Sequence, residues 1–92
     1  MLKINYLTQY RKDLKKAIKQ GLDLNELKTV IEMLQQQIKL PAKYRDHALR
    51  DSKHYKNCRE CHIHADWLLV YRIKQKELIL ELVRTGTHSN IL

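Results

Sequence analysis

The most constraining feature of the sequence is an apolar run at residues 67–73, which reads WLLVYRI. Three residues separate it from an alternating polar and apolar segment at 58–63. The polar sequence KQKE at 74–77 then leads into a second alternating segment at 78–84. Connections this short join antiparallel strands, because a parallel pair needs a crossover of a dozen or more residues. The sequence therefore predicts three consecutive strands in an antiparallel meander.

The alternation of side chains along a strand assigns these residues to two faces. One face is predicted to carry Trp67, Leu69, Tyr71, Ile73, Leu78, Leu80 and Leu82. The opposite face is predicted to carry Glu60, His62, Arg72 and Glu81. Because an antiparallel sheet commonly packs one face on the core, we expect helices to cover the leucine face and His62 to lie on the polar face. Gly86 is expected to mark a bulge or a sharp bend.

The N-terminal quarter predicts one short strand followed by one amphipathic helix. Residues 3–7 alternate weakly and are expected to form the strand. Residues 9–20 carry apolar side chains at helical spacing, with basic residues on the other faces. Thr8 is the expected N-cap of this helix, and Gly21 is the expected residue just beyond its end.

A second helix is predicted to begin after Asp23, with Glu26 completing a capping box three residues later. Pro41 cannot continue a helix, so we expect this one to end near Gln37. The fold class expected is α+β, in which an N-terminal strand and a two-helix hairpin pack on a mainly antiparallel sheet of about four strands. The length is that of a single domain, residues 1–92.

Positive charge dominates the composition, with 18 Lys and Arg residues against 10 Asp and Glu residues and a net charge of +8. Such an excess favours a polyanionic partner. The aperiodic segment 40–57 interleaves basic and aromatic residues, which suits a surface that faces RNA. The N-terminus has no signal-peptide pattern and no apolar run is long enough to span a bilayer, so we expect a cytoplasmic protein with no membrane partner.

Residues 58–62 read CRECH and match the attachment pattern of c-type haem. We reject haem, because proteins of that class are exported and because strand residues three apart point to opposite faces. A zinc site built from Cys58, Cys61, His62 and His64 fails for the same geometric reason. We therefore expect no metal and no cofactor, and we interpret the two cysteines as small buried thiols.

Five histidines in 92 residues indicate acid–base chemistry. The candidate residues are His47, His62, Asp66 and His88. RNA cleavage by transesterification needs a base for the 2′-hydroxyl proton and an acid for the departing 5′-oxygen, and histidine serves as either near neutral pH. Arginines such as Arg59 and Arg84 are suited to stabilise the charged phosphorane.

Four segments together resemble the YafQ-type toxins of the RelE/ParE superfamily. They read YRDHAL at 44–49, RECHI at 59–63, DWLLVY at 66–71 and RTGTHS at 84–89. The resemblance extends over nearly the whole chain and implies a small sheet-and-helix fold shared with microbial ribonucleases. It also implies a type II toxin that cleaves mRNA in the ribosomal A site without a metal.

The resemblance further implies that the catalytic residues are His47, His62, Asp66 and His88. Asp66 or His62 is then the general base and His88 the general acid, although coupled groups leave the choice of base open. Trp67 either braces the site, stacks on a base or is simply a core residue. The residues expected to contact the substrate are Arg59, Trp67, Arg84, Lys56, Tyr55 and Leu92.

The sequence departs from the family pattern in the segment 51–57 and at the last residue. The family usually has a Gly-x-Trp-Lys-Gly pattern there, whereas this chain has Tyr55 in place of the tryptophan and no glycine. Leu92 stands where an aromatic residue usually closes the chain, and a leucine would weaken stacking worth about 1–3 kcal/mol. We therefore expect altered activity or codon preference.

The implied partners are a cognate antitoxin resembling ribbon-helix-helix proteins, in a heterotetramer or larger complex, and the 70S ribosome with its mRNA. Operator DNA is expected to be reached only through the antitoxin. Two alternatives remain open: a ParE-like toxin that poisons DNA gyrase, and a non-catalytic nucleic-acid-binding module. ParE-like toxins lack the three histidines and the aspartate, so these residues favour the nuclease.

Overall fold

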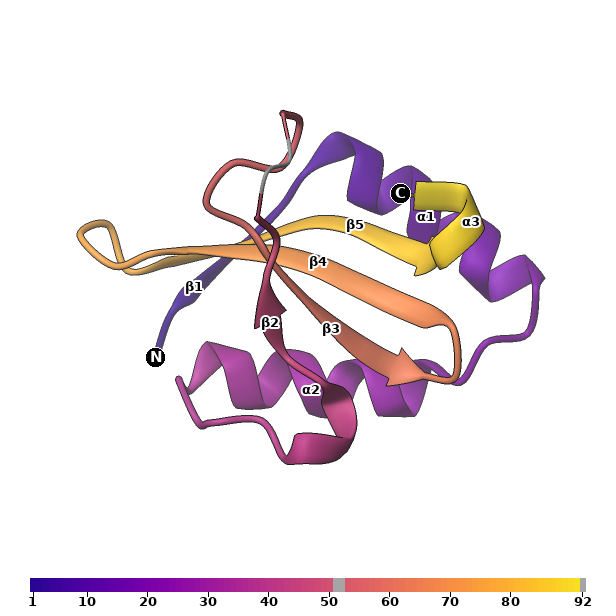
Figure 1. The fold of residues 1–92 in the computed structure, drawn as a ribbon, viewed down its shortest axis with the longest axis horizontal. Coiled ribbons are helices and arrows are strands. Elements are labelled where there is room, and N and C mark those ends of the chain that lie inside the picture. The colour runs from indigo at the N-terminus through magenta and orange to yellow at the C-terminus, as the bar shows by residue number, and fades with distance from the viewer. Residues whose placement is uncertain (51–52, 92) are drawn as a thin grey trace.

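One mixed sheet with helices against it makes up the part of the chain that the structure, a computed structural model, describes: residues 1–50 and 53–91 (Figure 1). The elements in chain order are β1 (Lys3–Tyr6), α1 (Thr8–Lys19), α2 (Leu24–Gln35), the 3-10 turn η1 (Ala42–Tyr44), β2 (His47–Ala48), β3 (Arg59–His64), β4 (Trp67–Lys74), β5 (Ile79–Thr87) and α3 (His88–Ile91). The sheet order is β1-β5-β4-β3-β2. The predicted α+β fold and its antiparallel meander are confirmed.

Two features of the sheet go beyond the prediction. β1 pairs with β5 in parallel, whereas the other strand pairs are antiparallel. β2 is an additional fifth strand that lies inside the segment expected to be aperiodic, and it pairs His47 with Glu60 and Ala48 with Arg59. A strand of two residues has no measurable alternation, so the sequence pattern gave no sign of it.

The helix boundaries follow the predicted start and stop residues with one exception. Leu7, not Thr8, is the N-cap of α1, and its backbone N–H donates to the Leu82 carbonyl, so the chain passes directly from β1 into the helix. Gly21 adopts a positive φ of 76° just after α1, as expected for that position. The Asp23 carboxylate caps α2 by accepting a hydrogen bond from the Asn25 N–H at 2.9 Å.

The inner face of the sheet carries the main core, which both helices cover. Its buried members from these elements are Tyr10, Ala17, Leu27, Val30, Leu34, Cys61, Ile63, Trp67, Leu69, Tyr71, Leu80 and Leu82. The predicted face is therefore confirmed for the strand residues named here, and Ile73 packs against the same cluster. Leu78 was wrongly placed on this face, because it lies in the turn before β5 with a φ of 55° and is 56% exposed.

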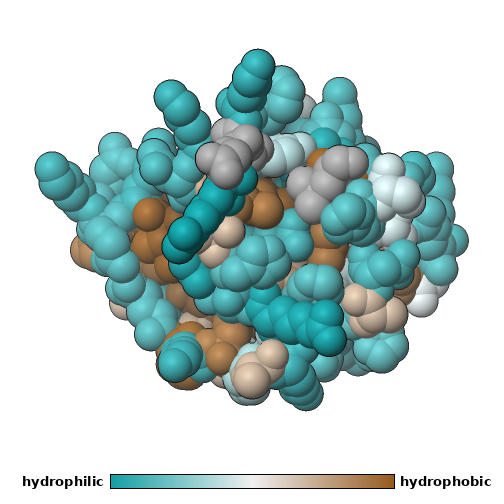
Figure 2. Space-filling view, viewed as in Figure 1, coloured by the Kyte–Doolittle hydropathy of each residue, from teal (hydrophilic) through white to brown (hydrophobic). Residues whose placement is uncertain are grey.

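The outer face carries polar groups around a second, smaller core. That core consists of Cys58, Leu68, Val70, Val83 and Ile91. Arg72 and Glu81 form an ion pair at 2.7 Å beside it. Cys58 and Cys61 are free thiols in two different clusters, in agreement with their predicted separation. In the view of Figure 2, which is that of Figure 1, most of the visible surface is hydrophilic, and some apolar side chains show between the polar ones.

Two bulges reset the alternation of side chains along the strands. In β5 the pairs Val70–Arg84 and Tyr71–Leu82 leave Val83 without a partner, so the bulge lies there and not at the predicted Gly86. Gly86 instead has a φ of 151°, and a Cβ atom on it would lie 3.2 Å from Ile91 Cγ2. The glycine thus lets α3 fold closely against β5. The second bulge lies at Ile63 in β3.

Within the described residues, none of the helices has the length and apolar character needed to cross a membrane. α1 and α3 lie together beside β5, and α2 lies nearer β3 (Figure 1). The last residues of β3, the first residues of β4 and the last residues of β5 lie at the same end of the sheet, and the candidate residues lie in or next to them.

Candidate active site

His47 and His62 converge on one buried carboxylate, that of Glu60. β2 places His47 directly opposite Glu60, and His62 lies two residues along β3 on the same face. The Nε2 atoms of His47 and His62 lie 3.5 Å and 3.8 Å from the Glu60 Oε1 atom. The centroids of the two imidazole rings are 6.4 Å apart. The structure therefore brings together two candidates that are distant in sequence.

Glu60 is a candidate site residue that sequence reasoning missed. Its side chain is buried, and its Oε2 atom has no hydrogen-bond partner within the described part of the chain. A buried carboxylate is costly unless a cation or donor compensates it, and here the histidine rings are its neighbours. The alternation of side chains along the strand predicts that Glu60 and His62 share a face, but the contact of Glu60 with His47 depends on the unpredicted strand β2.

Backbone carbonyls fix the other nitrogen of each ring. His47 Nδ1 donates to the Arg45 carbonyl at 2.7 Å, and His62 Nδ1 lies 3.4 Å from the Ala65 carbonyl. Because a carbonyl only accepts, each Nδ1 carries the hydrogen and each Nε2 faces Glu60. Arg45 and Ala65 both adopt the left-handed conformation, with φ of 47° in each case, which aims these carbonyls at the rings.

Asp66 and His88 form a second pair of candidates at the end of the sheet. Asp66 lies in the turn between β3 and β4, and His88 begins α3. The His88 backbone N–H donates to the Asp66 carbonyl at 3.1 Å, which holds the two residues side by side. Both side chains are exposed, and Ala65 in the same turn contacts His62. The two pairs of candidates therefore share one end of the molecule.

Arg59, a predicted phosphate ligand, is already paired with a carboxylate. Its Nε and NH2 atoms donate to Asp46 at 3.3 Å and 3.2 Å, and this hydrogen bonding raises the Arg59 pKa. Tyr71 also donates its hydroxyl to Asp46. Burial, together with the bond to Asp46, raises the pKa of Tyr71, so it stays a donor. Arg59 is thus oriented by the sheet while remaining partly exposed.

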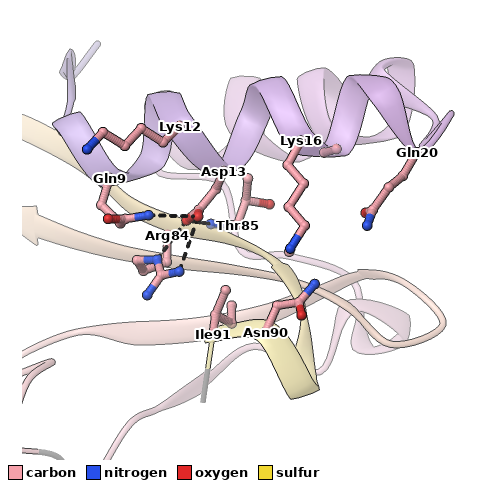
Figure 3. A pocket seen from close by; sticks show the side chains of 11 residues that line it. Gln9, Lys12, Asp13, Lys16, Gln20, Arg84, Thr85, Asn90 and Ile91 are labelled. Carbon is pink, nitrogen blue, oxygen red and sulfur yellow. Dashed lines mark hydrogen bonds and ion pairs between the residues drawn. The ribbon is translucent and has the colours of Figure 1, made fainter.

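Arg84 is held more firmly, in a cavity of about 260 Å³ between α1 and α3 (Figure 3). Its guanidinium donates to Asp13 at 2.7 Å and 3.1 Å, which raises the Arg84 pKa. Figure 3 shows Asp13 at the centre of this network, where it also accepts from Gln9 and from the Thr85 backbone N–H. Lys16 points from α1 into the same cavity (Figure 3).

The remaining predicted substrate contacts occupy different environments. Trp67 is 2% exposed and donates from Nε1 to Thr85 at 2.8 Å, so its position is that of a bracing core residue. Tyr55 donates its hydroxyl to the Ile91 carbonyl at 3.2 Å. Lys56 is exposed, and its carbonyl accepts from Arg72. Leu92 lies outside the described residues, as do positions 51 and 52 of the altered segment.

In residues 1–50 and 53–91, no three His, Cys, Asp or Glu side chains are placed so that they could hold a metal ion. Burial raises the pKa of Cys58 and Cys61, which keeps both thiols protonated and poor metal ligands. The candidate site therefore consists of acid–base groups at one end of the sheet, with Arg59 and Arg84 each bound to an aspartate.

Comparisons with known proteins agree on one family. The family model described as "Bacterial toxin of type II toxin-antitoxin system, YafQ" matches residues 2–92. The mRNA interferase toxin YafQ of Escherichia coli K12 is 41% identical over 87 residues, which cover 94% of this chain and 90% of that protein. A putative toxin YafQ of Haemophilus influenzae is 32% identical, with 96% and 89% covered.

Solved structures give the same result. A metal-bound toxin from Helicobacter pylori superposes with a TM-score of 0.92 and 43% identity, covering 100% of both chains. YafQ in the Escherichia coli DinJ–YafQ complex superposes with a TM-score of 0.87 and 38% identity, covering 100% of this chain and 99% of that one. The chain therefore belongs to the YafQ family of bacterial toxins of type II toxin–antitoxin systems.

Proposed function

We propose that the protein is an endoribonuclease that cleaves messenger RNA in the ribosomal A site. The observation that carries the proposal is the convergence of His47 and His62 on the buried Glu60, beside the exposed Asp66 and His88. Membership of the YafQ family supports it, because the Escherichia coli relative is an mRNA interferase.

The proposed reaction is an internal transesterification of the RNA. The ribose 2′-oxygen bonds to the adjacent phosphorus while a base takes the hydroxyl proton, and the bond from phosphorus to the 5′-oxygen breaks as an acid supplies a proton to that oxygen. The products are a 2′,3′-cyclic phosphate and a 5′-hydroxyl. Atoms and protons balance without any further reactant, so side chains alone can perform both transfers.

We assign the proton transfers to the exposed groups at the end of the sheet. His88 is the proposed acid, and Asp66 or His62 is the proposed base. Positioned acids and bases each contribute about 10²–10⁴-fold to such reactions. The backbone hydrogen bond between His88 and Asp66 supports this assignment, because it holds the proposed acid next to one of the proposed bases.

His47 and Glu60 are assigned supporting roles. Both ring nitrogens of His47 face acceptors, the Arg45 carbonyl and the Glu60 carboxylate, so the ring is held in one orientation beside His62. An imidazole fixed in this way can orient a phosphate oxygen of the RNA by hydrogen bonding. Glu60 is a positioning residue, because it acts on the RNA only through the orientation of His47 and His62.

The proposed partners are the ribosome, its mRNA and a cognate antitoxin. The net charge of +8 supports a cationic surface that binds a polyanion such as RNA, and the structure of the DinJ–YafQ complex supports a protein antitoxin. We expect the antitoxin to resemble ribbon-helix-helix proteins, to form a heterotetramer or larger complex, and to supply the contacts to operator DNA.

The test is cleavage of a defined mRNA on purified ribosomes, read by mapping the new 5′ ends. The wild-type protein should cut at discrete codons only when ribosomes are present, whereas His62→Ala and His88→Ala should lose about 10²-fold or more of the rate. Both variants should keep the wild-type circular dichroism spectrum and antitoxin binding, and His54→Ala, also on the surface, serves as the matched control.

Two outcomes would reject the proposal. One is equal cleavage by the wild type and both variants, and the other is intact mRNA with inhibited DNA gyrase, which would identify a ParE-like activity. Cleavage of free mRNA at the rate seen on ribosomes would reject the ribosomal part of the proposal alone.

A further inference from the structure

A hollow of about 370 Å³ lies directly beside His62, between η1 and the turn that joins β3 to β4. The side chains most relevant to its chemistry are Glu26, Lys43, Arg45, His62 and His64. Its volume falls within the range of about 300–1,000 Å³ that is usual for small-ligand sites. No residue of the hollow takes part in the proton transfers assigned above except His62.

Unusual backbone geometry builds both walls of this hollow. Arg45 on one wall and Ala65 on the other adopt the left-handed conformation, which is unfavourable for residues other than glycine. The bulge at Ile63 lies between them and turns His64 out of the regular alternation. Left-handed non-glycine residues and bulges are concentrated at functional sites, where they direct side chains and carbonyls toward a ligand.

Two cations that line the hollow, Lys43 and Arg45, are held less firmly than the other arginines of the site. Within the described residues, the Arg45 side chain has no acidic partner, unlike Arg59 and Arg84, which are bound to aspartates. The side chain of Lys43 is 68% exposed, and its ammonium lies 3.9 Å from the Glu26 carboxylate, at the outer limit of an ion pair, and 5.0 Å from the centroid of the Tyr44 ring. These two cations are therefore available to an RNA phosphate next to His62.

The lining of the hollow also includes a fixed hydrogen-bond acceptor, Glu26. The Glu26 carboxylate accepts a hydrogen bond from the Tyr44 hydroxyl at 3.1 Å, and Tyr44 is buried, so the carboxylate is held in one orientation. An ionised carboxylate only accepts hydrogen bonds. Adenine and cytosine present an exocyclic amine, and guanine presents two adjacent donors, whereas uracil presents a single N–H between two carbonyl groups.

We propose that this hollow is a nucleobase subsite of the RNA substrate, in which Lys43 and Arg45 bind a phosphate and Glu26 favours bases that carry an amine over uracil. The inference rests on the proposed function and adds to it the residues that select the sequence at the cut.

The first test uses Glu26→Gln, which keeps an acceptor for Tyr44 but adds an amide donor. The substrates are a set of ribosome-bound mRNAs in which each nucleotide that flanks the cut is varied in turn among A, C, G and U. The wild type should favour amine-bearing bases at one of these positions, and Glu26→Gln should reduce that preference about tenfold. Glu32→Gln, an exposed change on the same helix, should retain it. Equal preferences in the wild type and Glu26→Gln would overturn the proposal.

Arg45→Asn tests the phosphate contact without a new backbone cost, because asparagine tolerates the left-handed conformation. The variant should raise the KM for ribosome-bound mRNA about tenfold, as expected for the loss of one charged contact to phosphate, and should leave kcat and the melting temperature near wild type. A fall in kcat with an unchanged KM would contradict this role.

A binding experiment separates the subsite from the proposed function. In the His88→Ala protein, titration with 5′-AMP should shift the NMR signals of His62, His64 and Ala65 more than titration with 5′-UMP. Addition of the Glu26→Gln change should remove that difference. If the wild type cleaves no RNA but these shifts occur, the subsite stands and the nuclease proposal fails; if neither nucleotide shifts these signals, the subsite fails whatever the activity.

Discussion

Glu60 is buried in a position that is unfavourable for a carboxylate in folding and that suits its proposed role in orienting two histidines. Its carboxylate is buried against two histidine rings, and one of its oxygens has no donor among the described residues. Buried charges without full compensation cost free energy, and active sites are where such costs are commonly retained. In return, the Glu60 carboxylate holds the rings of His47 and His62 in fixed orientations.

Replacement of Glu60 by glutamine separates these two effects. We expect Glu60→Gln to lower the cleavage rate about tenfold or more, because the rings lose the charge that orients them. The free energy of unfolding should stay the same or rise by about 1 kcal/mol, because a buried charge is removed. Rate measurements and urea denaturation of the same sample check both parts. Glu77→Gln in the exposed turn before β5 should change neither, and a less stable Glu60→Gln protein would contradict the account.

At the scale of elements, one ion pair joins α1 to the strand that leads to His88. Asp13 on α1 binds Arg84 on β5, and Arg84 also donates to the Tyr55 hydroxyl, which in turn donates to the Ile91 carbonyl in α3. The network therefore links α1, β5, the segment before β3 that carries Tyr55, and α3. A short helix such as α3 has little stability of its own and depends on contacts of this kind.

Asp13→Asn should weaken this network. Hydrogen bonds to charged groups contribute about 1.5–3 kcal/mol each, so we expect the free energy of unfolding to fall by about 2 kcal/mol. The His88 amide should then exchange with deuterium faster, because α3 is less firmly held. Denaturant titration and amide exchange test the two effects, with Glu32→Gln as the control. Unchanged exchange at His88 together with lost stability would show that α3 is held in another way.

A second ion pair, Arg72 with Glu81, joins β4 to β5 and predicts a response to acid. Burial acts to raise the pKa of Glu81, but hydrogen bonding and charge from Arg72, with Lys74 and Asn5, outweigh it and leave the pKa below its usual value. A lowered pKa in the folded state contributes stability above the usual carboxyl range, and this stability is lost as the pH falls through the lowered value.

The comparison of wild type with Glu81→Gln measures this contribution. The difference in urea midpoint between the two proteins should be largest near neutral pH and should shrink as the solution is acidified toward the lowered pKa. A difference that grows on acidification would show that the sign of the shift is wrong.

The elements also show how far sequence patterns reach. The meander, the two helices and the Asp23 cap could be predicted, because each extends over enough residues for its spacing to be read. β2 and the bulge at Val83 could not, because each involves one or two residues and is decided by pairing with distant strands. The candidate site inherits this limit: His62 and Asp66 follow from the meander, whereas the meeting of His47 with Glu60 depends on β2.

For the whole molecule, the two buried thiols report on global unfolding. Cys58 and Cys61 are 2% and 0% exposed and lie on opposite sides of the sheet. Burial is the main cause of the raised pKa of each thiol. Since the thiolate is the reactive form, a native thiol of this kind reacts slowly.

Alkylation with iodoacetamide should therefore label neither cysteine in the folded protein at pH 8 and both in urea. The labelling rate should follow the fraction of unfolded molecules, because opening must precede reaction. Mass spectrometry of quenched samples gives the rate at each position. Rapid labelling of one cysteine in native buffer would indicate local opening of the face on which it lies.

The close approach of α3 to Gly86 has a consequence for how a gene of this kind behaves under selection. A side chain at this position would strain the backbone and would press on the Ile91 side chain, which would have to shift by a few tenths of an ångström. Cells that survive expression of a lethal gene without its inhibitor carry mutations that abolish killing. Many single-base substitutions in codon 86 replace the glycine and would have this effect. Sequencing of such surviving cells should find Gly86 replacements whose products still fold and still bind the inhibitor but no longer kill the cell.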